Sequence, residues 1–422
     1  MEPDHVSGQT GRFIKATSCL GQYPTLLKVM RNGGVIHDLI LKWFLGNGLV
    51  TALNHEQWYK QRRIMDLAFS SVYLRGLMGT FNERAETLME KLFYYFANNK
   101  KEAKMLHLVN CVTLDVIAKV AFGVDLDMLN KSSPFPKAIE TCLKGLVYFI
   151  RDFFFAFNPK NWPFISEVKE ACRFLRETGA QWIQDRKTAM RNDHKNVDSF
   201  VLFNFLIIPE ESMTKEDEEF MLDNFVTFFI AGQETTANLI ALCIMQLAKH
   251  PDVLEKLKKE LDEVIGMKQD LSYDDLGQLV YLSQVLKETL RLYPPVPVTS
   301  RELKEDIVID GIHIPGGVIG FFSSYVCGRM DKFFRDPLTF DPDRFHPDAP
   351  RPYYCYYPFA LGPRSCLGQN FAQMEAKVVM AKLLQRFDFT LLPGQTFDIL
   401  DTGTLRPKSG VSCSIGHRDH KK

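Results

Sequence analysis

The chain has 422 residues, 46% of them hydrophobic, and 51 basic against 51 acidic residues, so its formal net charge is zero. A chain of this size can bury a large core, and its neutral balance argues against a general nucleic-acid-binding protein. The nine cysteines are scattered and include no CxxC pair, which argues against a disulfide scaffold or a structural zinc site and favours a reducing, cytosol-facing environment.

The N-terminal segment has no apolar run of the length of a signal peptide or a membrane anchor. The stretch 35–50 is apolar, but His37, Asp38 and Lys42 interrupt it. We therefore expect no transmembrane helix in this chain.

Residues 43–207 have a largely helical pattern, because apolar residues recur at three- and four-residue spacing, as in 81–96. Proline-containing stretches at 133–136 and 158–164 are predicted to divide this region into separate helices. The acidic stretch 209–220 is predicted to be an exposed loop that leads into another helix.

The segment 220–250 is predicted to form one long helix, because no proline occurs before Pro251. It is apolar almost all round, which is typical of a helix through the middle of a fold. Gly232, Glu234 and Thr235 nevertheless lie at its centre. Gly232 weakens the helix where an acid and an alcohol can hold water and pass protons. Alternatively, these are polar residues of a core helix whose threonines bond back to the preceding turn.

The remaining elements alternate between helices and short strands. Helices are predicted in 251–266, around 279–290 and in 370–389, and short strands in 306–326, 389–394 and 411–416. No stretch marks a convincing domain boundary, so we predict a mainly α fold with small β-sheets and one domain over 1–422.

Cys366 lies between Gly362 and Gly368, with Arg364 two positions before it. A lone cysteine is more often an inert core residue. Here the glycines let the backbone approach a flat partner, and the helix predicted after Cys366 presents its positive end to the sulfur, which favours the thiolate. One thiolate is too few for structural zinc but is sufficient as the axial ligand of a haem iron. Arg364 then suits a haem propionate.

Two further charged motifs carry little information when taken alone. Glu288 and Arg291 are three residues apart on a helix, and the expected reading is a surface ion pair that contributes under about 1 kcal/mol. Trp58 and Arg62 share one helix face, which beside a haem could receive a propionate. The basic stretch 60–63 is usually a solvated face, or else docks an acidic electron donor.

Together these motifs resemble those of the cytochrome P450 monooxygenases. The matching residues are Phe359, Gly362, Arg364, Cys366 and Gly368 of the haem loop, Ala231, Gly232, Glu234, Thr235 and Thr236 of the oxygen-activation helix, Glu288 and Arg291 with residues 342–345, and Trp58 with Arg62. Arg301 falls where many members hold a propionate. The resemblance runs from about residue 43 to the C-terminus. Several segments most resemble the animal cholesterol 24-hydroxylases, which have His where this chain has Gln233.

The resemblance implies a cytochrome P450 fold and a haem b cofactor whose iron is ligated by the Cys366 thiolate. The residues that it places beside the haem are Trp58, Arg62, Arg301 and Arg364 at the propionates, with Phe359, Ala231 and Gly232, while Thr235 and Glu234 manage proton delivery. It further implies hydroxylation of a sterol, with the cholesterol side chain as the expected target. The resemblance also implies that oxygen is the oxidant and that electrons come from NADPH through NADPH-cytochrome P450 reductase at the cytosolic face of the endoplasmic reticulum membrane.

The N-terminus departs from this pattern. Family members of this type begin with a membrane anchor, a proline-rich hinge and the first strands of a small sheet, and we expect these to be missing or replaced within 1–40, which leaves a sheet edge unpaired. Two alternatives stay open. One is a haem-thiolate isomerase of peroxides, against which the presence of both Glu234 and Thr235 argues, and the other is an inactive haem-binding remnant.

Overall fold

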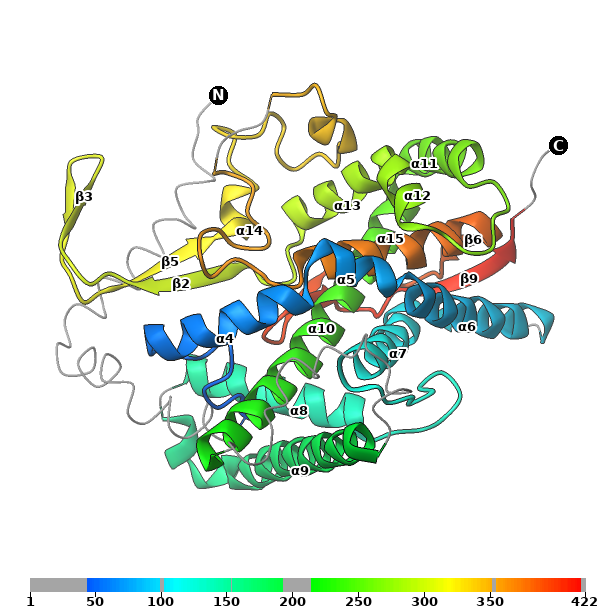
Figure 1. Ribbon diagram of the computed structural model, residues 1–422. Coiled ribbons are helices and arrows are strands. Elements are labelled where there is room, and N and C mark those ends of the chain that lie inside the picture. The colour runs from blue at the N-terminus through cyan, green and yellow to red at the C-terminus, as the bar shows by residue number, and fades with distance from the viewer. Residues whose placement is uncertain (1–43, 99–101, 153, 193–213, 351–353, 419–422) are drawn as a thin grey trace.

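The computed structural model describes residues 44–98, 102–152, 154–192, 214–350 and 354–418. Within these ranges the chain is mainly helical, and its strands form four small antiparallel sheets (Figure 1). This confirms the predicted fold class. The expectations of an atypical N-terminus, a missing anchor and missing first strands concern residues 1–40, which lie outside the described residues.

The helices are α4 His55–Ala68, α5 Ser71–Gly76, α6 Met78–Ala97, α7 Met105–Ile117, α8 Phe135–Arg151, α9 Trp162–Asn192, α10 Lys215–Lys249, α11 Pro251–Val264, α12 Tyr273–Gln278, α13 Val280–Leu292, α14 Ser324–Cys327 and α15 Gln369–Arg386. The strands are β1 Ala103–Lys104, β2 Val298–Glu302, β3 Ile307–Ile309, β4 Ile312–Ile314, β5 Ile319–Ser323, β6 Phe387–Leu391, β7 Ile399–Asp401, β8 Leu405–Pro407 and β9 Ser412–His417.

Helix α10 crosses the middle of the molecule, with α7, α8 and α9 on one side and α13 and α15 on the other (Figure 1). This confirms the predicted long core helix. It begins earlier than predicted because Thr214 caps it: the Thr214 hydroxyl accepts a hydrogen bond from the Asp217 N–H, and the Asp217 carboxylate accepts one from the Thr214 N–H. At Gly232 a Cβ would lie 2.7 Å from Cδ1 of Ile117, so the glycine allows α7 to approach α10 closely.

The Glu288–Arg291 pair is fully buried, so the surface position expected for the isolated motif is wrong. Both Glu288 carboxylate oxygens accept hydrogen bonds from Arg291, each 2.7 Å long. Arg291 also donates to the backbone carbonyls of Gly328, Pro337 and Thr339. The pair therefore ties α13 to the chain segment that precedes the Cys366 loop.

The sheets are small and antiparallel. Strand β9 lies between β1 and β6, while β2 pairs with β5, β3 with β4 and β7 with β8. The sequence predicted β3, β4, β5, β6 and β9. It missed β1, β2, β7 and β8, which have two to five residues. The equally short β3 and β4 were predicted because the Asp310-Gly311 turn signal lies between them.

Two helical stretches in the described residues, Met105–Phe122 and Lys215–Lys249, are long and apolar enough to span a membrane. In each, 78% of the most apolar window is buried inside the protein, as in core helices.

Candidate functional site

The Cys366 loop presents its sulfur in an accessible place. The Cys366 N–H donates to the Phe359 carbonyl at 2.8 Å, and Gly362 has φ +80°, so the loop turns back on itself just before α15 begins. The Cys366 side chain is exposed, yet burial among surrounding atoms raises the pKa of its thiol. The Gly368 N–H and the Arg62 charge lower this pKa but do not outweigh burial. The prediction that the helix end alone favours a thiolate is therefore not met in the free thiol, which a bound cation would deprotonate.

The middle of α10 has an accessible face, although the helix is otherwise buried. Ala231 is exposed and Thr235, one turn later, is half-buried. The Thr235 hydroxyl donates to the Ala231 carbonyl at 2.8 Å, as the core-helix alternative predicted. The helix is continuous from Lys215 to Lys249, so the opening predicted near Gly232 does not occur.

Glu234 and Thr235 form hydrogen bonds with different partners. Its Oε1 accepts hydrogen bonds from the Asn238 side chain at 3.2 Å and from the Thr404 hydroxyl at 3.0 Å. Thr404 lies in the turn between β7 and β8. The structure thus does not join Glu234 and Thr235 as the predicted acid–alcohol pair.

The predicted Trp58–Arg62 face lies against the Cys366 loop. Arg62 donates to the Ser365 carbonyl at 2.7 Å and also pairs with Asp66 at 2.8 Å. Trp58 is buried, and the Arg364 guanidinium carbon lies 4.1 Å from the centroid of its ring. Helix α4 and the loop thus hold each other's arginines in place.

Arg301 and Arg364 bring two positive charges together, and no acid among the described residues forms an ion pair with either. Burial and the nearby Arg301 charge lower the pKa of Arg364. Arg364 donates to the Ala52 carbonyl and Arg301 to the Ser300 carbonyl, and in the described ranges neither has a carboxylate partner within ion-pair distance. Two such guanidinium groups fit the carboxylates of a haem, which suit bidentate donors.

Phe69, which the sequence analysis missed, connects the Cys366 loop with α10. Its ring lies 6.0 Å from that of Phe228, which precedes Ala231 by one turn. A Cβ on Gly368 would lie 3.9 Å from Phe69 and 4.0 Å from the Cys366 sulfur. Phe69 thus packs between the Cys366 loop at Gly368 and α10 at Phe228. A single aromatic after a helix has no motif that could have revealed this.

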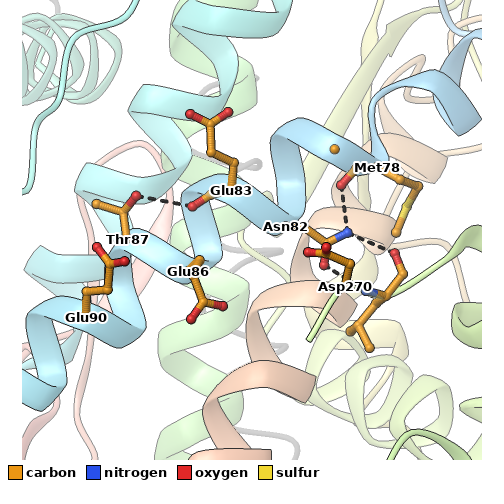
Figure 2. Close-up of a pocket in the computed structure, with 9 residues that line it drawn as sticks. Met78, Asn82, Glu83, Glu86, Thr87, Glu90 and Asp270 are labelled. Carbon is orange, nitrogen blue, oxygen red and sulfur yellow. Dashed lines mark hydrogen bonds between the residues drawn. The ribbon is translucent and has the colours of Figure 1, made fainter. Parts of the chain in front are cut away.

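A surface pocket of about 560 Å³ lies along α6, outside the Cys366 region (Figure 2). Glu83, Glu86, Glu90 and Asp270 give it an acidic lining. Glu86 is already paired with Lys382 at 3.0 Å and with Arg386, so it joins α6 to α15. No group of three or more His, Cys, Asp or Glu side chains suited to a metal ion occurs among the residues that the structure describes.

Comparison with known proteins identifies one family. A family model described as Cytochrome P450 matches residues 35–414. The chain is 30% identical to Cytochrome P450 4d2 of Drosophila melanogaster over 408 residues, which cover 90% of the chain and 79% of that protein. It is 31% identical to Cytochrome P450 4A2 of Rattus norvegicus (97% and 82% covered) and 31% identical to Cytochrome P450 3A7 of Homo sapiens (82% and 70%). These names do not include a cholesterol 24-hydroxylase, so the narrower resemblance has no support from these relatives.

Proposed function

The chain belongs to the cytochrome P450 family, and from this premise we propose that Cys366 is the thiolate ligand of its haem iron. Members of the family are haem-thiolate monooxygenases, so the protein is an oxidoreductase with haem as its cofactor. When bound, the haem supplies the activation of oxygen, and the thiolate donates electron density that favours O–O cleavage. The single observation that carries the assignment is the accessible Cys366 sulfur, presented by a loop that Phe69 connects to α10.

We assign the acidic groups of the haem to the arginines around the Cys366 loop. Arg301 and Arg364 lack a carboxylate partner in the described part of the chain, and propionates would compensate both charges. Trp58 orients Arg364 by stacking, and Arg62 fixes the loop at Ser365. These contacts would set the cofactor's orientation before any substrate enters.

On the opposite wall, small residues would leave room for a flat ring. Ala231 carries only a methyl group there, and Phe359 is half-buried in the Cys366 loop. Gly232 would contribute only its backbone, because the position of a Cβ on it faces Ile117 of α7. The Thr235 hydroxyl donates its hydrogen to the Ala231 carbonyl. Its oxygen therefore remains available to accept a hydrogen bond from water or a substrate hydroxyl. We propose that Thr235 manages protons at this wall. The proton-delivery role expected for Glu234 is not supported by its contacts, which favour the different role argued below.

The proposed substrate is a sterol hydroxylated on its side chain, and this rests on the resemblance of several segments to the cholesterol 24-hydroxylases. The proposed electron donor is NADPH-cytochrome P450 reductase at the cytosolic face of the endoplasmic reticulum. Lys60 and Arg63 are exposed on α4, next to Arg62 at the Cys366 loop, and so offer positive charge to an acidic donor near the proposed haem.

The test compares the chain with two cysteine variants after expression with haem. Wild-type protein and Cys327→Ser, which changes a half-buried cysteine outside the proposed ligand set, should show the thiolate spectrum of the ferrous–CO form. Cys366→Ser should lose that spectrum, because an alcohol is a poor substitute for the thiolate. Retention of the spectrum in Cys366→Ser would show that another residue ligates the iron. A spectral titration with cholesterol tests the substrate separately, and no shift would remove the sterol proposal without affecting the ligand assignment.

A further inference from the structure

The hairpin formed by β7 and β8 contacts two helices, α8 and α10, and α10 carries Thr235 of the proposed site. Its turn, residues 402–404, reaches α10 at Glu234, and the hairpin also lies along one face of α8. The two helices are far apart in sequence, so the hairpin is a direct physical link between them.

On the α10 side, three buried side chains form one closed hydrogen-bonded group. Thr404 Oγ1 donates to Glu234 Oε1 at 3.0 Å, and the Asn238 side-chain amide lies 3.2 Å from the same oxygen and 3.0 Å from Thr404 Oγ1. The exposed fractions are 8% for Glu234, 0% for Asn238 and 7% for Thr404. Because buried polar groups are costly when unpaired, the three side chains depend on one another.

On the α8 side, two ion pairs hold the hairpin. Arg151 at the end of α8 pairs with Asp401 of β7 at 2.6 Å, and Arg406 of β8 pairs with Glu140 of α8 at 2.8 Å. The Arg406 and Lys144 partners lower the pKa of the Glu140 carboxyl, against the effect of burial. The hairpin is thus fixed near both ends of α8.

Between the two ion pairs the backbones come close together. Gly403 has φ +95°, and a Cβ there would lie 3.4 Å from Val147 and 3.8 Å from Leu143 of α8. Leu143, Val147 and the two paired α8 residues recur at three- and four-residue spacing, so they form one helix face. The Leu405 N–H also donates to the Pro295 carbonyl at 2.8 Å, which anchors the turn to the chain after α13.

We propose that Glu234 is a positioning residue: it holds the β7–β8 hairpin on α10 through Thr404, and the hairpin thereby sets the distance from α8 to the wall that carries Thr235. The contact itself does not require haem, whereas its consequence for ligands rests on the proposed function. Glu234 acts here as a hydrogen-bond acceptor, because its Oε1 receives two donors and is not directed with Thr235 toward the accessible face.

The contact is tested first by protein stability and amide hydrogen exchange. Glu234→Ala and Thr404→Val each remove the contact, whereas Glu234→Gln keeps an acceptor oxygen and Thr404→Ser keeps the hydroxyl. The first two should lower Tm and speed exchange in residues 399–407, and the two conservative variants should do neither to a comparable extent. The double variant Glu234→Ala/Thr404→Val should lower Tm by about as much as the larger single change, because both remove one shared contact. Additive shifts in Tm would overturn the proposal.

The positioning role is tested next on the haem-loaded protein with two iron ligands of different size. Imidazole needs little room above the haem, whereas 4-phenylimidazole reports how closely α8 and the hairpin approach. Thr404→Val should change the ratio of the two dissociation constants, and Thr404→Ser should restore the wild-type ratio. A general loss of stability would leave the ratio unchanged, and that result would also overturn the proposal.

Turnover distinguishes the positioning role from proton delivery. Loss of a proton donor would lower kcat by about 100-fold or more in Glu234→Gln and Glu234→Ala alike. The positioning role predicts that Glu234→Gln keeps a clearly higher kcat than Glu234→Ala, and that Thr404→Val resembles Glu234→Ala. Equal losses in both Glu234 variants with an unaffected Thr404→Val would refute it. If neither the wild-type protein nor any variant turns over, the monooxygenase assignment fails. The hydrogen-exchange and Tm results would still show whether Glu234 holds the hairpin through Thr404.

Discussion

Replacing Arg291 by alanine should remove most of the folded protein, because this side chain is completely enclosed. Arg291 and Glu288 have no exposed side-chain surface, and both oxygens of the buried Glu288 carboxylate accept hydrogen bonds from Arg291. Its guanidinium donates to the Glu288 carboxylate and to three backbone carbonyls, at Gly328, Pro337 and Thr339. The substitution therefore leaves a buried carboxylate and three carbonyls short of donors.

The magnitude follows from these contacts. Removing one partner of a buried ion pair costs about 3–5 kcal/mol, and each carbonyl left without a donor adds about 1–3 kcal/mol unless water enters. Glu288 keeps the Asp341 N–H at 2.8 Å and lies 3.4 Å from Arg344, which compensates only part of its charge. We expect a loss of at least about 5 kcal/mol, comparable with the total stability of an ordinary domain, about 5–15 kcal/mol.

Urea unfolding followed by circular dichroism, together with soluble yield, measures this loss. Lys259→Ala is the matched control, since Lys259 pairs with Glu263 at 3.8 Å with both side chains mostly exposed. That control should change the free energy of unfolding by under about 0.5 kcal/mol. A loss below about 1 kcal/mol for Arg291→Ala, the range of exposed pairs, would refute the claim that this buried network holds α13 to the loop segment.

Two further predictions concern other buried positions, Gly328 beside Arg291 and Asp115 of α7. Gly328→Ala should destabilise the protein by about 1–3 kcal/mol, because a Cβ there would lie 2.5 Å from the Arg291 carbonyl oxygen, and an unchanged Tm would contradict this. Burial raises the pKa of Asp115 to about 6, so its contribution to stability is complete below its unfolded pKa near 4 and is lost as pH rises through about 6. Asp115→Asn should remove this part of the fall in urea midpoint between about pH 4.5 and 7, and an identical fall in both proteins would exclude Asp115 as its source.

Features that depend on neighbouring residues were predictable from the sequence. The long apolar run from residue 220 to Pro251 indicates a core helix, because its apolar content and the first proline are both local. The capping box at Thr214 is local too, but the acidic residues after it were predicted to be a loop. The same holds for the Cys366 loop, where two glycines and the start of α15 lie within ten residues. Three residues cannot establish a period, so short strands are predicted only where a turn signal helps: Asp310-Gly311 revealed β3 and β4, whereas β7 and β8 were missed.

Contacts between distant residues were decided only by the tertiary structure. Glu288 and Arg291 have the spacing of an ordinary surface pair, and only the segment 37 to 48 residues further along encloses them. Glu234 stands next to Thr235 in sequence, yet its partner Thr404 is 170 residues away. The physical reason is that a side chain's role depends on which groups exclude water from it and bond to it, and chain folding brings those groups together from sequence positions that no local pattern connects.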